Sequence, residues 1–210
     1  MSYPKQFGSL LEASSYQSPG GGAKYAPMRK KIVDTAVEMG YDAETMVEVG
    51  VVWADDHDPF QHIKNHQYPH WANTCNLRVF QSFEAHLKDK FKDLMAARHI
   101  GVMVKGFSLD LKAPVNFPDS IIVANRLAEV KPDRYKGVTS MWSLTQGRIV
   151  ANMEGYVVFF DYDKGRPANL LEAGGVHADL YHALEARRAR EEKRALDWEA
   201  KNPKKLRAKF

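Results

Sequence analysis

The sequence contains a single cysteine, Cys75, among its 210 residues. One cysteine can form neither an intrachain disulfide nor a cysteine-rich zinc site, and this scarcity suits a reducing compartment. No apolar run approaches the roughly 18 to 20 residues that a membrane-spanning helix needs. The N-terminus also lacks the apolar segment of a secretory signal. We therefore expect a soluble, intracellular protein, either cytoplasmic or mitochondrial.

Acidic residues are scarce in the first 26 residues, where Glu12 is the only one. The run Ser-Pro-Gly-Gly-Gly at 18–22 predicts an extended N-terminal arm without secondary structure. A mitochondrial presequence is acid-poor too, but this arm lacks arginine and the period of an amphipathic helix. The next segment, Met28–Met39, has apolar residues at helical spacing and predicts a short helix that ends at Gly40.

The charge is only moderately basic, with a net value of +4 when histidine is neutral, and 44% of the residues are apolar. That apolar content is enough for one compact domain with terminal extensions. The basic excess lies mainly in the segment Arg187–Lys209 and suits an anionic ligand as well as RNA. Apart from Trp198, no aromatic side chain interleaves with these basic residues, so nucleic acid is not predicted as a partner.

The middle of the chain has an α+β pattern. A β-branched strand at Glu48–Trp53 precedes a polar loop, and apolar residues three or four apart then predict one long helix, or two in tandem, from Pro69 to Arg98. Alternating or continuous β-formers follow. They predict four strands joined by short turns, at Gly101–Leu111, Ser120–Val130, Gly137–Thr145 and Arg148–Tyr162.

An antiparallel sheet that wraps one hydrophobic helix accounts for this order of elements. In the last strand Ala151 and Gly155 are small, and we expect them to let that helix approach the sheet closely. They are predicted to share one face of the strand with Ile149, Met153 and Val157. Because such a sheet has exposed edge strands, we expect two copies to pair, as a homodimer or a dimer of dimers.

The C-terminal segment Val176–Ala200 has a charged helical pattern that ends at Asn202 and Pro203. Its Glu and Lys or Arg residues at helical spacing between Glu185 and Arg194 predict a solvated helix, with a docking arm for a partner as the alternative. A segment this polar is expected to supply little of the core. Deletion of Val176–Phe210 should then leave the rest folded.

Two blocks of the chain carry a resemblance to a known family. Trp53–Tyr68 reads Trp-Ala-Asp-Asp-His-Asp-Pro-Phe-Gln-His-Ile-Lys-Asn-His-Gln-Tyr, and Leu109–Asp119 reads Leu-Asp-Leu-Lys-Ala-Pro-Val-Asn-Phe-Pro-Asp. The first is similar to Asp-x-Asp-x-x-x-His-Val-Asn-Asn-x-x-Tyr of the hotdog thioesterases of the 4-hydroxybenzoyl-CoA type, with Asp56 and Asp58 as its carboxylates. The second is similar to the family's Asp-Tyr-x-x-Pro-Val-x-Phe-Gly-Asp. The sequence departs from the family at Gln61, Lys64 and Pro118.

The resemblance implies a hotdog fold, with a sheet wrapped around one long central helix. It divides the chain into an N-terminal arm and short helix (1–46), a hotdog domain (47–170) and a charged C-terminal helix or tail (171–210). It also implies hydrolysis of an acyl-CoA or acyl-carrier thioester without a metal or other cofactor. Asp58 would be the nucleophile or general base, a backbone amide near Asn65 would polarise the carbonyl, and His62, Asn65 and Tyr68 would contact the substrate.

Each of these residues also has a simpler structural interpretation. Asp58 before Pro59 is a common turn or capping residue. The neighbouring Asp55, Asp56 and His57 are predicted to form a solvated loop. Glu84 could be a helix-borne base in a second hotdog subclass, although a charged helix residue usually faces solvent. Asp110 is expected to order a strand end, and Trp71 and Cys75 are predicted to lie in the core.

A metal site is a further alternative, because His62, His66 and His70 are spaced by four residues. Pro69 interrupts a helix through all three, which argues against it. A catalytically silent hotdog subunit of a larger assembly, a mitochondrial one for example, is the rival to the hydrolase. Such a subunit would dock through its terminal extensions, and Gln61, Lys64 and the charged tail favour it.

Overall fold

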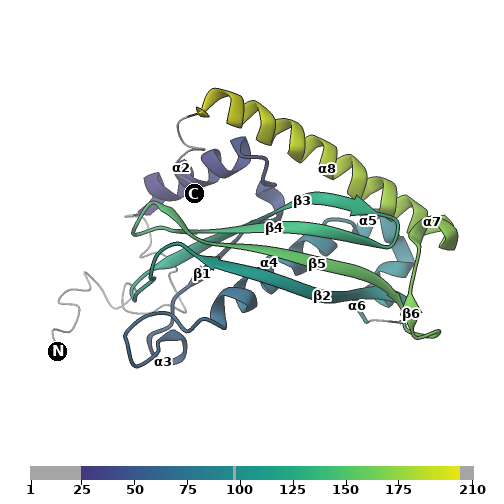
Figure 1. Ribbon diagram of the computed structural model, residues 1–210, viewed down its shortest axis with the longest axis horizontal. Helices are drawn as coiled ribbons and strands as arrows, with labels where there is room; N and C mark the ends of the chain where they lie inside the picture. The colour runs from purple at the N-terminus through teal and green to yellow at the C-terminus, as the bar shows by residue number, and fades with distance from the viewer. Residues whose placement is uncertain (1–24, 97, 204–210) are drawn as a thin grey trace.

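The computed structural model describes residues 25–96 and 98–203, and within them the strands form one six-stranded antiparallel sheet (Figure 1). The strand order is β1-β3-β4-β5-β2, with β6 paired to the end of β5. All four predicted long strands are confirmed, whereas the first strand is shorter than predicted. The strands are β1 Val47–Gly50, β2 Ile100–Leu111, β3 Ser120–Lys131, β4 Arg134–Ser143, β5 Arg148–Asp161 and β6 Arg166–Pro167.

One face of the sheet packs against α4 (Gln67–Gln81). This helix begins two residues before Pro69, which therefore lies in the first turn, where its missing N–H costs little. The predicted helical segment is confirmed, but it ends at Met95 and is divided into more pieces than the one or two helices predicted, since three short elements follow α4. They are α5 Glu84–Leu87, η3 Lys88–Lys90 and α6 Phe91–Met95. The fully buried Cys75 and the buried Trp71 pack against sheet residues such as Val123 and Met141, as predicted for the core.

The opposite face of the sheet is covered in part by α2 (Ala26–Glu38), which confirms the predicted N-terminal helix. Its buried Ile32 and Ala36 pack against Trp142 of β4. The chain then turns at Gly40, whose φ of +94° suits glycine. A short 3-10 helix, η2 (Ala43–Thr45), leads into β1. The predicted extended arm falls almost wholly on residues 1–24, outside the described part of the chain.

The prediction that Ile149 lies on the same face of β5 as Ala151 is wrong. The register of β4 and β5 shifts, so that Met141 pairs with Ala151 but Trp142 pairs with Ile149. This bulge moves Ile149 to the α2 side of the sheet, while Ala151 stays on the α4 side. The expected close approach at Gly155 is also wrong, because a Cβ there would meet no atom within 4 Å.

The C-terminal helix α8 (Gly175–Lys201) follows the short α7 (Leu170–Ala173), and its predicted position is confirmed. The expectation that it is too polar to supply core is wrong, because Leu180 and Leu184 are fully buried in the same cluster as Phe83 of the α4 side. β1 pairs only with residues 120–123 of β3, and α8 lies along the remaining outer side of that strand (Figure 1). Among the described residues, no helix is both long and apolar enough to span a membrane.

Candidate active site

The motif loop between β1 and α4 starts with a helical turn, α3 (Trp53–Asp56), so the strand predicted to reach Trp53 ends earlier. Asp56 is only 6% exposed, and its carboxylate accepts a 2.6 Å hydrogen bond from the backbone N–H of Val52. Its carbonyl oxygen accepts another, at 2.7 Å, from the N–H of Lys64. The prediction that Asp56 is solvated is therefore wrong, because its carboxylate binds Val52 at one end of the loop and its backbone carbonyl binds Lys64 at the other.

Asp58 directly follows His57, which forms an isolated β-bridge with Ile63 across this loop. Its Oδ1 accepts hydrogen bonds from the backbone N–H groups of Phe60 at 2.9 Å and His62 at 3.0 Å. Asp58 therefore caps its own turn, as the simpler interpretation predicts. Within the described residues, Oδ2 of this carboxylate has no hydrogen-bond partner. One oxygen holds the loop, and the other makes no hydrogen bond to the described residues.

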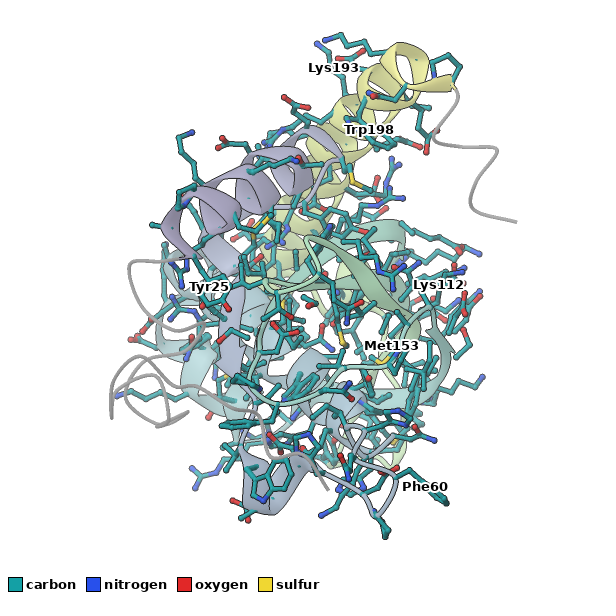
Figure 2. All side chains as sticks on the ribbon, turned by 90° about the vertical axis from the view of Figure 1, so that its left-hand side faces the viewer. Tyr25, Phe60, Lys112, Met153, Lys193 and Trp198 are labelled. Atoms are coloured by element: carbon teal, nitrogen blue, oxygen red, sulfur yellow. The ribbon has the colours of Figure 1, made fainter. Side chains whose placement is uncertain are left out.

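Gln61, at the position where the family often has glycine, has a φ of 65°. This left-handed conformation explains the family's glycine, because a side chain there is strained. The carbonyl oxygen of Gln61 accepts a 2.8 Å hydrogen bond from the side-chain amide of Asn116, which also donates to the carbonyl of Val115. The two sequence motifs thus meet at this turn. At its tip Phe60 is 79% exposed and points away from the protein (Figure 2).

His57 fastens the same loop to the second motif. Its Nε2 accepts a 2.9 Å hydrogen bond from the backbone N–H of Phe117, so Nε2 carries no proton. The imidazole also stacks at a tilt on Trp53, with ring centroids 4.9 Å apart. Burial lowers the pKa of His57, which keeps the ring neutral. Neither sequence motif predicted this role, because the partners lie 60 residues apart.

A surface pocket of about 270 Å³ lies beside this loop, and the structure brings His62, Asn65 and Tyr68 together in its wall. Asp58 is not part of the lining and lies next to it, through its bond to the N–H of His62. Burial raises the pKa of Tyr68 to about 12, so its hydroxyl keeps its proton. The opposite wall comes from the last residue of β2 and the three residues that follow it, which the second motif covers but which were not predicted as site residues. It consists of Leu111, Lys112, Ala113 and Pro114.

Free backbone donors lie at the start of α4, beside this pocket. Among the described residues, none accepts a hydrogen bond from the N–H of Asn65 or of His66, the residues just before the helix. The N-terminus of a helix carries partial positive charge, which favours an anion there. The arrangement can therefore stabilise negative charge that develops on an oxygen atom near Asn65.

The side chains of the other candidate residues are not part of the pocket lining. Glu84 is exposed at the start of α5, and Asp110 forms an ion pair with Lys112. His66 and His70 are exposed. In the part of the chain that the structure describes, no three His, Cys, Asp or Glu side chains form a group that could hold a metal ion. Burial raises the pKa of the Cys75 thiol to about 12, which makes it a poor nucleophile.

The pocket and its two motifs lie within residues 51–184, which match the family model of the Thioesterase-like superfamily. The chain belongs to this superfamily. A search of curated proteins gave no significant match. The matched segment includes both motif blocks and stops within α8, so the second half of that helix lies beyond it.

Solved thioesterase structures have the same fold as this thioesterase-like chain. The DHNA-CoA thioesterase of Staphylococcus aureus is 16% identical, with a TM-score of 0.55, over 67% of this chain and 90% of that one. A Thermus thermophilus thioesterase, crystallised with coenzyme A and zinc, is 21% identical, with a TM-score of 0.52, over 67% of this chain and 93% of that one. The predicted hotdog fold of the α+β class is thereby confirmed.

Proposed function

We propose that this protein hydrolyses an acyl-CoA or acyl-carrier thioester, with Asp58 as the general base or nucleophile. The observation that carries the proposal is the pocket lined by His62, Asn65 and Tyr68, which lies beside the Asp58 turn and the free amides at the start of α4. Membership of the thioesterase-like superfamily supports the same class of reaction. The chemistry needs a base, donors for an oxyanion and a pocket for the acyl group.

The free Oδ2 of Asp58 would remove a proton from a water molecule as that water attacks the thioester carbonyl carbon. The carbonyl oxygen becomes an oxyanion, which the N–H groups of Asn65 and His66 would stabilise. Collapse of this intermediate breaks the C–S bond. The leaving thiolate takes the proton back from Asp58, which leaves a carboxylic acid and a free thiol. Direct attack by Asp58 would give an anhydride that water then hydrolyses.

The side chains around this site would orient the acyl group. Tyr68, which keeps its proton, can donate a hydrogen bond to a polar group of the substrate. Lys112 on the opposite wall provides positive charge at the pocket, although its pairing with Asp110 neutralises part of it. An anionic carrier group would approach from this side.

A homodimer through β2 is part of the same proposal. β2 is an edge strand, and it exposes apolar side chains that a monomer would leave in water: Met103, Val104, Phe107 and Leu111. Such an edge strand commonly pairs with a second copy. Because Leu111 also lines the pocket, a partner paired along β2 would lie next to the site and shield it from water. A dimer of dimers would require a further contact.

The structure of the Asp58 loop favours the rival function, a catalytically silent subunit of a larger assembly. Oδ1 of Asp58 already holds the loop, and the departures at Gln61 and Lys64 alter the motif around it. The side chain of Lys64 donates a 2.8 Å hydrogen bond to the carbonyl of Asp55, so it serves the loop and not the pocket. A scaffold would need this loop for its shape alone.

Hydrolysis of short and long acyl-CoA substrates by the full chain tests the proposal. We expect Asp58→Asn to lower turnover by at least about 100-fold, because an amide is neither a base nor an anionic nucleophile. The fold should persist, since the amide oxygen can still cap the turn. Glu84→Gln is the matched control and should keep wild-type turnover. If Glu84→Gln loses activity while Asp58→Asn keeps it, the general base is Glu84 and not Asp58. A wild-type protein that hydrolyses none of these thioesters would favour the catalytically silent subunit.

A further inference from the structure

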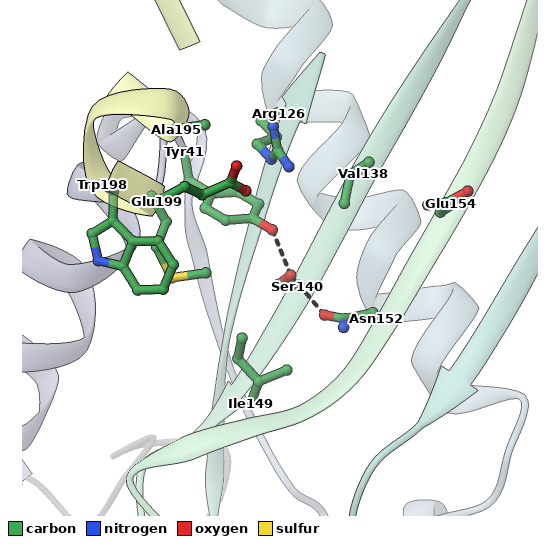
Figure 3. Close-up of a pocket in the computed structure, with 11 residues that line it drawn as sticks. Tyr41, Arg126, Val138, Ser140, Ile149, Asn152, Glu154, Ala195, Trp198 and Glu199 are labelled. Carbon is green, nitrogen blue, oxygen red and sulfur yellow. Dashed lines mark hydrogen bonds between the residues drawn. The ribbon is translucent and has the colours of Figure 1, made fainter. Parts of the chain in front are cut away.

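A second cavity lies on the side of the sheet that faces α2 and α8, away from α4 and the Asp58 loop. It has a volume of about 110 Å³ and lies between the outward-facing side chains of β3, β4 and β5 and the C-terminal half of α8 (Figure 3). Ser140 and Asn152 point to this side because their strand neighbours Met141 and Met153 point to the α4 side. The thioesterase-like chemistry does not use this cavity.

A chain of hydrogen bonds crosses the floor of the cavity (Figure 3). Ser140 Oγ donates to Asn152 Oδ1 at 2.7 Å, so the 2.5 Å contact between Ser140 and the hydroxyl of Tyr41 has Tyr41 as donor. Nδ2 of Asn152 is left free, since no described residue accepts a hydrogen bond from it. The floor therefore offers an N–H donor to whatever occupies the cavity.

Arg126 supplies a second donor. Its guanidinium lies over the ring of Tyr41, 5.8 Å from the centroid. The buried Nε of Arg126 has no hydrogen-bond partner among the described residues, although leaving such a donor unpaired costs roughly 1 to 3 kcal/mol. Within the same residues Arg126 has no ion-pair partner. The positive charge of the Arg126 guanidinium is therefore uncompensated, and it would attract a negatively charged group of a ligand in the cavity.

Glu199 brings the opposite charge to the same cavity. It lines the cavity from α8 beside the buried Trp198, and within the described chain it has no ion-pair partner. Glu154, the other carboxylate in the wall, is already paired with Lys136 at 2.6 Å. Arg126 and Glu199 thus share one cavity without forming an ion pair with each other. A ligand that carries both charges would complement the two side chains.

We propose that this cavity binds a small zwitterion of the amino-acid type, with its carboxylate at Arg126 and Asn152 and its ammonium at Glu199 and Trp198. Charge-assisted hydrogen bonds are the stronger kind, and an indole ring attracts a cation. The volume limits the ligand, because a water molecule occupies about 30 Å³ and a cavity of about 150 Å³ accepts benzene. Glycine and alanine fit this limit, whereas amino acids with long side chains do not.

Calorimetric titration of the full chain with glycine and L-alanine tests the proposal. Acetate and methylammonium are the matched probes, because each carries only one of the two charges. We expect saturable binding of glycine or alanine that is at least about 10-fold tighter than binding of either single-charge probe, the equivalent of about 1.4 kcal/mol. Absence of saturable binding of both amino acids would mean that only water fills the cavity, and it would overturn the proposal.

Substitutions in the cavity test the binding of the carboxylate end and of the ammonium end of the ligand separately. Arg126→Gln should weaken glycine binding by at least about 10-fold, and Glu199→Gln should do the same while leaving acetate binding unchanged. Arg134→Gln is the control, since Arg134 is exposed and pairs with Asp133 outside the cavity. If Arg126→Gln fails to fold, Glu199→Gln at the partly exposed rim decides the question. Equal binding of glycine by Glu199→Gln and the wild type would exclude a zwitterion.

Discussion

Nε of Arg187 lies 2.7 Å from Oε1 of Glu191 inside the protein, where each side chain is 2% exposed. The other carboxylate oxygen of Glu191 accepts a 2.6 Å hydrogen bond from the backbone N–H of Leu127, on the outer side of β3. Arg187 donates to Thr45 at 3.1 Å and to Ser82 at 3.3 Å. One ion pair on α8 therefore fastens this helix to β3, to η2 and to the end of α4.

Removal of one partner from this pair should destabilise the fold strongly. We expect Arg187→Leu to lower the free energy of unfolding by about 3 to 5 kcal/mol, because it leaves Glu191 charged and buried. Arg188→Leu is the control, since Arg188 pairs with Glu185 and Glu192 near the surface and should lose less than about 1 kcal/mol. Urea denaturation measures both. A loss in Arg187→Leu as small as that in Arg188→Leu would contradict the role of the buried pair.

Deletion of residues 176–210 should abolish cooperative unfolding. The deletion removes Leu180 and Leu184 from the core and exposes the outer side of β3. A calorimetric melt and gel filtration of the truncated chain test this expectation. Deletion of 204–210 alone is the control, and a cooperative melt of the long truncation near the wild-type temperature would show that α8 is dispensable.

His57 should make stability depend on pH. The pKa of His57 is lower in the folded protein than its ordinary value of 6.5. As the pH falls, the imidazole is therefore protonated in the unfolded chain before it is protonated in the folded protein. The contribution of neutral His57 is therefore complete above about pH 6.5 and declines as the pH falls from there towards the lower folded pKa. Denaturation at pH 7.5 and at pH 5.5 measures the difference.

His57→Gln separates this effect from that of the other histidines. Glutamine can still accept the hydrogen bond from Phe117 N–H but does not titrate, so the variant should lose less stability between the two pH values than the wild type does. The same pH dependence in the wild type and His57→Gln would show that His57 does not contribute.

Gln61→Gly should stabilise the protein by up to about 1 kcal/mol, because glycine adopts a φ of 65° without strain. The greater freedom of glycine in the unfolded chain offsets part of the gain. Gln61→Val should destabilise it, since a β-branched residue is least tolerated in this conformation. Chemical denaturation of the two variants is the measurement. A less stable glycine variant would show that the side chain of Gln61 has a contact that matters more than its backbone strain.

Phe107→Lys and Val104→Lys should convert a dimer into a monomer, because they place charge on the open edge strand that we propose as the interface. Leu196→Lys is the control, since Leu196 is exposed on α8, which packs against β3 and not along the β2 edge. Light scattering at micromolar concentration reports the mass. A wild-type monomer, or a dimer that both lysine variants leave intact, would contradict pairing through β2.

The sequence alone determined the long strands, the tandem helices and the motif loop. These features depend on local signals: the period of apolar residues, the turn residues between strands and the spacing of Asp56, Asp58 and Tyr68. The resemblance to the thioesterases implied that His62, Asn65 and Tyr68 contact the substrate, and in the structure these three residues line one pocket. The sequence also raised the alternative that Asp58 caps a turn, and the structure has that cap.

Only the tertiary structure decided which polar residues are buried. Arg187 and Glu191 have the pattern of a solvated helix, but their partners Thr45, Ser82 and Leu127 lie far away in the sequence. A bulge moved Ile149 to the other face of β5, and no periodicity within one strand reveals the register of its neighbour. The second cavity likewise joins Arg126 to Glu199 across the fold. Burial of charge depends on long-range pairing, which local patterns do not encode.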